Sequence, residues 1–191
     1  MKRPFPTVHI PPSQLLYHVS RSAYAGAALY FGSKNNRYDD PRSRFGVLYL
    51  GFDLATPLME SVFHDHAWSL GVRAITPAAL GDRLVREVGV VEQLTVLDLT
   101  APGAMAGCFG LNLHQLTSRD YACTQAIAVL AHGQDDIDGI LYPSRNNYPG
   151  NCLALFDRCG DKLGLVADIP LDRHRRWPAF AEDYAIELRG L

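Results

Sequence analysis

The sequence lacks any long hydrophobic run. Among its 191 residues, no apolar stretch reaches the roughly 20 residues that a membrane-spanning helix needs. The N-terminal residues 1–6 include Lys2 and Arg3, but no apolar segment follows them, so we expect no secretion signal. We therefore expect a cytoplasmic protein without a membrane partner.

The sequence also has little net charge and few cysteines. Lysine and arginine total 18 against 20 aspartate and glutamate, so composition gives no support for direct nucleic-acid binding. The short basic run 173–176 is followed by acidic residues, which favours a solvated surface. The four cysteines form no C-x-x-C pair, so we expect neither disulfides nor a zinc site.

Several common catalytic and phosphate-binding motifs are missing. The glycines form neither a P-loop nor a G-x-G-x-x-G element. Ser144 lacks the G-x-S-x-G elbow of serine hydrolases, so it is either a turn serine or a hydrogen-bonding residue. His64 and His66 stand two positions apart and would not share a helix face, which favours exposed histidines over metal ligands. We expect no metal.

What is present is the composition of a globular domain, with 48% hydrophobic and 20% charged residues. Prolines mark residues 1–14 as an extended arm, and residues 15–191 as one domain. We expect a single mixed α+β fold with small central sheets flanked by helices. Apolar patterning predicts strands at 15–20, 45–52, 94–99, 138–144 and 151–156, helices at 56–64, 77–84 and 121–131, and a strand plus a helix in 170–191. Residues 23–31 fit either helix or strand.

Glu60 is the most informative residue in the chain. It lies where a buried strand passes into a helix that opens at Thr56-Pro57, and a lone carboxylate there is costly to bury without a partner. Arg37, Tyr49 and Ser144 lie in segments that could supply partners. A carboxylate, a guanidinium, a phenol and a hydroxyl together suit cleavage of a nucleotide–ribose bond.

The loop 37–40, Arg-Tyr-Asp-Asp, has two interpretations. It could be a surface salt-bridge cluster, which contributes little stability. Alternatively, Arg37 could bind a diphosphate, because its planar fork of donors matches phosphate oxygens.

Taken in order, several short motifs resemble those of the RES-domain family, the toxins of Xre–RES toxin–antitoxin pairs. The resemblance covers about residues 15–160. Each motif alone is weak, but five in the same order are specific. The motifs are Leu16-Tyr17-His18, Arg37-Tyr38-Asp39, Gly46-Val47-Leu48-Tyr49-Leu50-Gly51 followed by Glu60, Asp138-Gly139-Ile140-Leu141-Tyr142-Pro143-Ser144-Arg145, and Ala154-Leu155-Phe156.

The resemblance implies a fold like that of the ADP-ribosyltransferases, with NAD as the substrate and no metal. It implies catalytic roles for Glu60, Ser144 and Arg37. His18, Arg37, Tyr49 and Ser144 would bind NAD, with Tyr49 stacking on the nicotinamide and His18 contacting the adenosine-side ribose or phosphate. It further implies a helix-turn-helix antitoxin of the Xre type as partner, and the free toxin could form a homo-oligomer.

At one position the chain departs from the family pattern. His18 stands where the family has its name-giving arginine. As a substitute donor to the dinucleotide, His18 would make NAD affinity weaken as the pH rises through its pKa. Alternatively, it is a strand-end histidine bound to a backbone carbonyl.

Three functions remain open at this point. The first is an NAD-degrading toxin that cleaves the nicotinamide–ribose bond. The second is a protein ADP-ribosyltransferase, whose acceptor could be recognised by residues 68–93 or 103–120. The third is a non-catalytic NAD-binding module.

Overall fold

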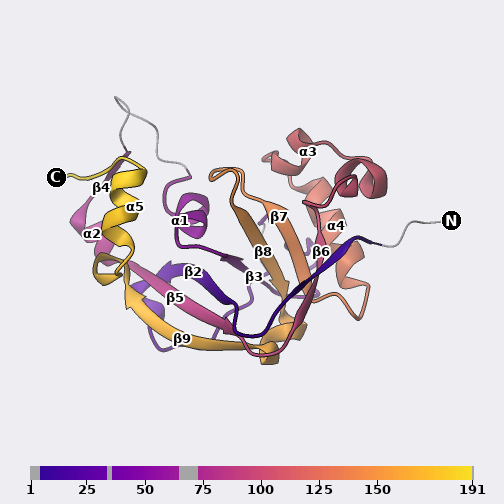
Figure 1. Cartoon of the computed structure of the whole chain (residues 1–191), viewed down its shortest axis with the longest axis horizontal. Coiled ribbons are helices and arrows are strands. Elements are labelled where there is room, and N and C mark those ends of the chain that lie inside the picture. Colours follow the sequence, from indigo (N-terminus) through magenta and orange to yellow (C-terminus); the bar gives the residue numbers. More distant parts are fainter. Residues whose placement is uncertain (1–4, 34–35, 65–72, 191) are drawn as a thin grey trace.

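The main element of the fold is an eight-stranded β-sheet, which is strongly curved (Figure 1). The computed structural model describes residues 5–33, 36–64 and 73–190. The mixed α+β domain predicted from the sequence is confirmed. In spatial order the strands are β1 (Thr7–Ile10), β6 (Leu94–Asp98), β7 (Gly139–Pro143), β8 (Asn151–Phe156), β3 (Val47–Gly51), β2 (Leu15–Arg21), β5 (Arg83–Val90) and β9 (Leu163–Pro170).

Neighbouring strands of this sheet are antiparallel except for β6 and β7, which are parallel. A parallel pair needs a crossover connection, and the helices between β6 and β7 supply it. A second, two-stranded sheet pairs β4 (Arg73–Ile75) with β10 (Ile186–Leu188).

The helices are short and gather at the two ends of the sheet. In Figure 1, α3 and α4 lie at one end, α2 and α5 at the other, and α1 lies between them. No helix in the described part of the chain is both long and apolar enough to cross a bilayer. The helices are α1 (Ala55–Ser61), α2 (Pro77–Gly81), α3 (Leu113–Thr117), α4 (Ala122–His132) and α5 (Trp177–Asp183), with 3₁₀ turns at Ser22–Tyr24, Asp157–Lys162 and Leu171–Arg173 and a π-helix at Ala104–Phe109.

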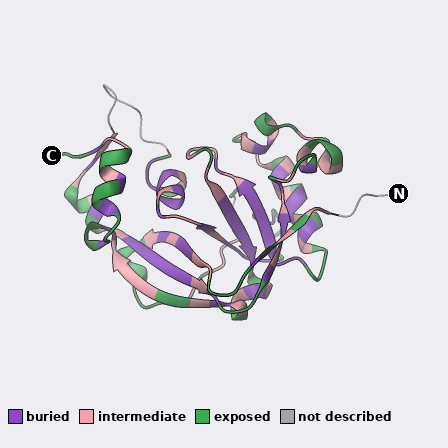
Figure 2. Cartoon of the chain, in the orientation of Figure 1, coloured by how far each residue is buried: buried purple, intermediate pink, exposed green. Residues whose placement is uncertain are grey.

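The central strands are buried on both faces (Figure 2). Alternate residues of β8 serve different clusters, because successive side chains of a strand point to opposite faces. Leu153 and Leu155 pack with Leu48 in one cluster. Ala154 and Phe156 pack in another, which includes residues of α4. The face that carries Ala154 also carries the candidate site.

Three boundaries differ from the sequence-based prediction. Residues 7–10 of the predicted arm are extended, but they pair with β6 and so form an edge strand of the sheet. The helix expected to reach His64 ends at Ser61. The helix expected at 77–84 ends at Gly81, because β5 begins at Arg83 and pairs with both β2 and β9.

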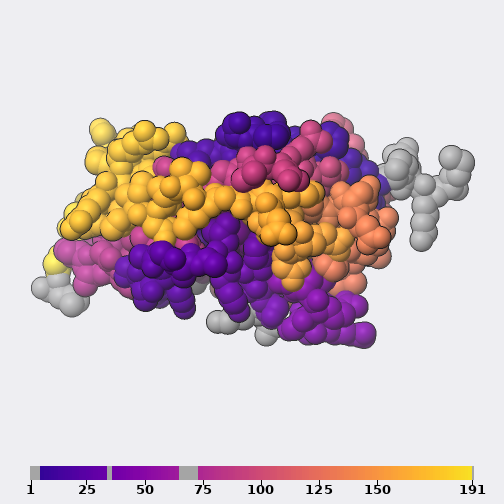
Figure 3. Space-filling model, turned by 90° about the horizontal axis from the view of Figure 1, so that it is seen from below, coloured from indigo at the N-terminus to yellow at the C-terminus, as the bar shows by residue number. Residues whose placement is uncertain are grey.

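Strands β5 and β9 were not predicted. Charged residues within β5 hide its apolar pattern, yet Arg86 is only 3% exposed. Its Nε donates to Asp168 of β9 at 2.9 Å, so the two charges neutralise each other within the sheet. Strand β9 runs across the face seen from below (Figure 3). In the tail, helix α5 precedes strand β10, and residues 25–31 form neither helix nor strand.

Candidate active site

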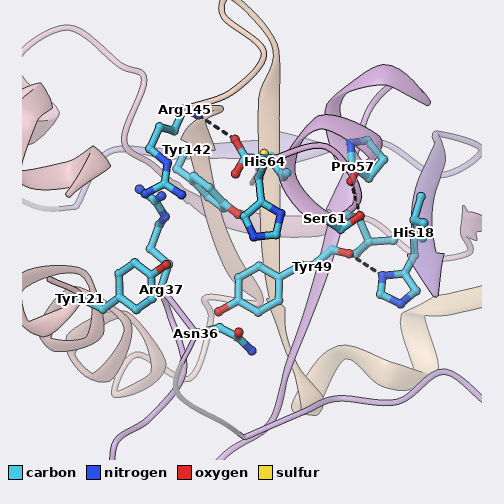
Figure 4. Close-up of a pocket in the computed structure, with 14 residues that line it drawn as sticks. His18, Asn36, Arg37, Tyr49, Pro57, Ser61, His64, Tyr121, Tyr142 and Arg145 are labelled. Atoms are coloured by element: carbon cyan, nitrogen blue, oxygen red, sulfur yellow. Dashed lines mark hydrogen bonds between the residues drawn. The ribbon is translucent and has the colours of Figure 1, made fainter. Parts of the chain in front are cut away.

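A pocket of about 380 Å³ opens between the sheet and the helices α1 and α4 (Figure 4). Its size falls within the range of small-molecule sites. Four of the five residues predicted for the site line it, and Ser144 lies behind one of them. The lining residues are His18, Val19, Asn36, Arg37, Tyr49, Leu50, Pro57, Glu60, Ser61, His64, Tyr121, Tyr142, Arg145 and Cys152.

The Glu60 carboxylate is held by four hydrogen bonds from one turn. Oε1 accepts from Ser144 Oγ at 2.6 Å, from the backbone N of Arg145 at 2.8 Å and from the backbone N of Asn146 at 3.0 Å. Oε2 accepts from Asn146 Nδ2 at 3.0 Å. Donors that converge on a carboxylate fix its direction. Glu60 is therefore an oriented carboxylate at the wall of the pocket.

Helix α1 brings Glu60 to this turn. Asp53 Oδ1 accepts from the Thr56 backbone N at 2.7 Å and so satisfies a free donor of the first turn. Gly51 lets the helix approach β3 closely, since a Cβ there would lie 2.5 Å from Pro57 Cδ. The strand-to-helix junction predicted from the sequence thus places Glu60 one turn from the sheet.

Ser144 is both a turn residue and a hydrogen-bonding residue. It is 3% exposed, and its hydroxyl accepts from the backbone N of Asn147 at 2.9 Å while it donates to Glu60. Asn147 in turn donates from Nδ2 to Thr56 Oγ1 at 3.0 Å and accepts from the Tyr184 hydroxyl at 2.5 Å. The turn is therefore fixed on α1 and on the C-terminal segment.

Arg37 and Arg145 are both anchored at the C-terminal end of α3. Arg37 Nη1 donates to the carbonyl of Leu116, and Arg145 Nη1 donates to the carbonyl of Thr117 at 3.2 Å. Arg37 is 7% exposed and its guanidinium lies 5.6 Å from the centre of the Tyr121 ring. Two guanidiniums thus converge beside Glu60, which suits an anionic ligand.

The loop 37–40 is buried, and one of its two aspartates pairs with the half-exposed Arg44. Asp39 and Asp40 are 0% and 1% exposed. Asp40 Oδ2 pairs with Arg44 Nε at 2.7 Å, and hydrogen bonds from Arg44 hold the pKa of Asp40 well below its usual value. The loop is an ordered part of the site.

Tyr49 is fixed by its hydroxyl. The phenol donates to Asp39 Oδ1 at 2.7 Å and accepts from the Tyr38 backbone N at 2.9 Å. Burial, together with the negative charge of Asp39, raises the pKa of Tyr49 well above its ordinary value. These two hydrogen bonds fix the position of the ring against the 36–40 loop. Stacking of the ring on a ligand stays a prediction.

His18 occupies a site on β2 at the edge of the pocket. Its Nδ1 lies 2.8 Å from the Tyr49 backbone carbonyl oxygen. Burial lowers the pKa of His18 below its ordinary value, although the hydrogen bond to Tyr49 opposes this. The carbonyl contact considered from the sequence is confirmed, but His18 lies in the middle of β2 and not at a strand end. The same ring also lines the pocket.

Sequence reasoning missed several pocket residues. Arg145 stands within a motif that was quoted without a role for it. Asn146, which does not line the pocket but donates to Glu60, follows it directly. Tyr121 begins the α4 segment, where it was read only as part of a helical pattern. His64 is exposed and lines the pocket, whereas Asp65 and His66 lie outside the described residues. Within the described ranges, no group of three or more His, Cys, Asp or Glu side chains could hold a metal.

Comparison with known proteins agrees with the motifs. Residues 15–179 match the family model described as the RES domain. The chain belongs to the RES-domain family. A structure entitled "Crystal structure of the M.tuberculosis MbcT-MbcA toxin-antitoxin complex" contains a chain with the same fold. Its TM-score is 0.65 at 19% sequence identity, and the match covers 93% of this chain and 91% of that chain. A search of curated proteins gives no match.

By the motif resemblance, His18, Glu60 and Ser144 stand at the three name-giving positions of the family. His18 lies on β2, and Glu60 and Ser144 are joined by a 2.6 Å hydrogen bond. The matched range ends before Tyr184, whose hydroxyl bonds to Asn147 in the turn that follows Ser144. Support for the Glu60 turn therefore comes in part from outside the matched segment.

Proposed function

We propose that this protein cleaves the nicotinamide–ribose bond of NAD. The observation that carries the proposal is the Glu60 carboxylate, oriented by four hydrogen bonds in a pocket that two guanidiniums also enter. An NAD molecule has matching features, since its diphosphate is anionic and its nicotinamide-bearing ribose becomes cationic during cleavage.

The leaving group of this reaction sets what the site must supply. Nicotinamide leaves from a cationic form, so it needs no proton from a general acid. The ribose becomes oxocarbenium-like, as sugars do in glycoside hydrolysis. A fixed carboxylate beside the ribose stabilises that cation without reorganisation, which is commonly the largest catalytic contribution. Glu60 has this role in the proposal, and it also accepts a hydrogen bond from the ribose 2′-hydroxyl.

The remaining residues bind and orient the dinucleotide. Arg37 and Arg145 would hold the diphosphate, because each offers donors in a planar fork. The Tyr49 ring would stack against the nicotinamide, a contact worth about 1 kcal/mol. Ser144 orients Glu60 through the 2.6 Å hydrogen bond.

We further propose that the chain acts as the toxin of a toxin–antitoxin pair. Support comes from membership of the RES family and from the fold shared with a chain of a toxin–antitoxin complex. The partner would be an Xre-type helix-turn-helix antitoxin that occludes the pocket and competes with NAD for Arg37. The free toxin could self-associate.

Two experiments test the proposed reaction. Purified protein is incubated with NAD, and nicotinamide release is followed in water and with added phosphate. In parallel, tagged NAD and a cell lysate reveal whether ADP-ribose is transferred to proteins. Nicotinamide release without labelled protein supports an NAD-degrading enzyme, whereas labelled bands support a protein ADP-ribosyltransferase. Absence of release in every condition supports a non-catalytic binding module and contradicts the proposed reaction.

A further inference from the structure

Hydrogen bonding fixes the tautomer of His18. A carbonyl oxygen only accepts hydrogen bonds, so the 2.8 Å contact with Tyr49 places the proton on Nδ1. Because burial also lowers the pKa of this histidine, the ring is neutral near pH 7. Nε2 then carries a lone pair. The residue in the arginine position is thus a hydrogen-bond acceptor, where an arginine would only donate.

Among the described residues, the Nε2 acceptor of His18 has no protein donor, and the guanidinium of the nearby Arg86 is already paired. Nε2 makes no hydrogen bond to any residue in the described part of the chain, and the ring lines the pocket. Arg86 lies directly opposite His18 on β5. Its guanidinium is committed to Asp168 and to the carbonyls of Ala27 and Ala28. Arg86 therefore does not replace the family arginine as an open positive charge.

The charged and polar residues of the pocket are arranged in sequence from one side of it to the other. Figure 4 shows Arg37 and Arg145 on one side, and His18 on the opposite side near Pro57 and Ser61. Glu60 lies beside Arg145, with its Oε1 2.8 Å from the Arg145 backbone N, and it follows Pro57 by one helical turn. Glu60 thus stands between the cationic side and the side of His18.

This order sets the direction of a bound dinucleotide. With the diphosphate at the two arginines and the reacting ribose at Glu60, the nicotinamide ring lies on the far side, where His18 is. The walls there include Val19, Leu50 and Pro57, which suit the flat faces of an aromatic ring. The one hydrogen-bonding group of that ring is its amide.

We infer that His18 is a specificity-determining residue whose Nε2 accepts a hydrogen bond from the amide of nicotinamide and thereby rejects nicotinic acid. The inference rests on the proposed function. An amide NH₂ is a donor that matches a lone pair. A carboxylate has no donor and would bring an unpaired negative charge against a neutral acceptor and apolar walls, which is costly. The expected substrate class is therefore the amide dinucleotides.

The test compares the binding of three dinucleotides by titration calorimetry in a Glu60→Gln background, which prevents turnover. The ligands are NAD, nicotinic acid adenine dinucleotide, and nicotinamide hypoxanthine dinucleotide, which changes only the adenine amino group. NAD should bind roughly tenfold to a hundredfold more tightly than the nicotinic acid form, since an unmatched buried polar group costs about that factor. The hypoxanthine form should bind like NAD.

Variants of His18 then test whether this residue causes the preference for the amide form. His18→Arg should abolish or reverse it, because arginine donates and is cationic, whereas His18→Gln, which keeps an acceptor oxygen, should retain it. His9→Arg, an exposed change on β1, is the control for added charge. Thermal unfolding confirms that each variant is folded.

Three outcomes would overturn the inference. The first is equal binding of the amide and acid forms to the His18-containing protein. The second is a ratio that His18→Arg leaves unchanged. The third is a His18-dependent loss with the hypoxanthine form, which would place His18 at the adenine. Nicotinamide release from NAD by the unmutated protein separately tests the proposed function. Release of nicotinamide from NAD and of nicotinic acid from the acid dinucleotide at equal rates therefore refutes only the amide preference. Failure to bind any dinucleotide refutes both.

Discussion

The Ser144 hydroxyl donates a 2.6 Å hydrogen bond to Glu60 Oε1, across 84 positions of sequence. It thereby joins the turn after β7 to the end of α1. The same oxygen also accepts from two backbone amides of that turn, so the carboxylate direction is set by one rigid segment. Catalysis in this account depends on that direction more than on the acidity of any group.

Replacing Ser144 with alanine should lower kcat and leave KM nearly unchanged. The variant loses one donor to Glu60 and one acceptor for the Asn147 amide. A loss of about 1–3 kcal/mol corresponds to roughly tenfold to hundredfold in rate. Steady-state nicotinamide release measures both constants.

Ser22→Ala is the control for this change, because Ser22 is exposed, does not line the pocket, and its hydroxyl donates to Asp82 Oδ1 at 3.2 Å. The two variants should differ clearly in kcat. Equal kcat values would show that the Ser144 hydroxyl does not orient Glu60.

Substituting Arg37 with lysine should raise KM for NAD about tenfold. Lysine keeps the charge but loses the planar fork and the stacking on Tyr121. Arg42→Lys, an exposed change in the same loop, should leave KM unaltered. A kcat effect without a KM effect in Arg37→Lys would place Arg37 in the chemistry and outside dinucleotide binding.

The pH dependence of His18 should lie on the acid side of neutrality. Its pKa is lowered, so between that value and the ordinary value of about 6.5 the unfolded chain binds more protons than the folded one. The His18 contribution to stability is therefore present above pH 6.5 and declines as the pH falls toward the lowered pKa. In the folded protein, protonation turns Nε2 from an acceptor into a donor as the pH falls through the lowered pKa.

We accordingly expect kcat/KM to be level from about pH 7 to 8.5 and to fall below about 6.5. This expectation is opposite in sign to the one drawn from the sequence, in which NAD affinity falls as the pH rises, because the inference above gives His18 an acceptor role. His18→Gln, which does not titrate, should move the acid limb to lower pH. Superimposable profiles for the two proteins would exclude His18 from the pH response.

Removing the Tyr184 hydroxyl should weaken the turn that carries Ser144. Tyr184→Phe loses the hydrogen bond to Asn147 but keeps the ring, which stacks on Phe180 with centroids 4.6 Å apart. The free energy of unfolding should fall by about 1 kcal/mol, with a several-fold lower kcat. Tyr148→Phe, at a site 82% exposed, is the matched control. Identical unfolding curves for the two variants would show that the Tyr184 hydroxyl does not stabilise the turn.

The sequence predicted the parts of the site that depend on local pattern. Glu60 was found because a carboxylate at the end of an apolar strand and helix start needs partners. Ser144 was found because a recognisable strand and turn precede it. The His18–Tyr49 contact was not predictable in the same way, since a backbone carbonyl has no sequence signature. The role of Arg145 depends on where α3 places the Thr117 carbonyl, which only the fold determines.

The fold itself was predicted where strands are uniformly apolar. Strand β8 was placed correctly because all its central residues are buried. Strand β5 was missed because Arg86 interrupts it, and its partner Asp168 stands 82 positions away. Long-range ion pairs of this kind override local patterning, so the sheet was predicted in part and its order was not.

The most direct measurement is nicotinamide release from NAD by the wild-type protein and by Glu60→Gln, at equal concentration and after both are shown to be folded. The substitution preserves the shape of the side chain and removes only its charge. We predict release by the wild type and a loss of at least about a hundredfold in kcat for the variant, as expected when a fixed charge opposite a developing cation is removed. Release at the wild-type rate by a folded Glu60→Gln protein would contradict the account.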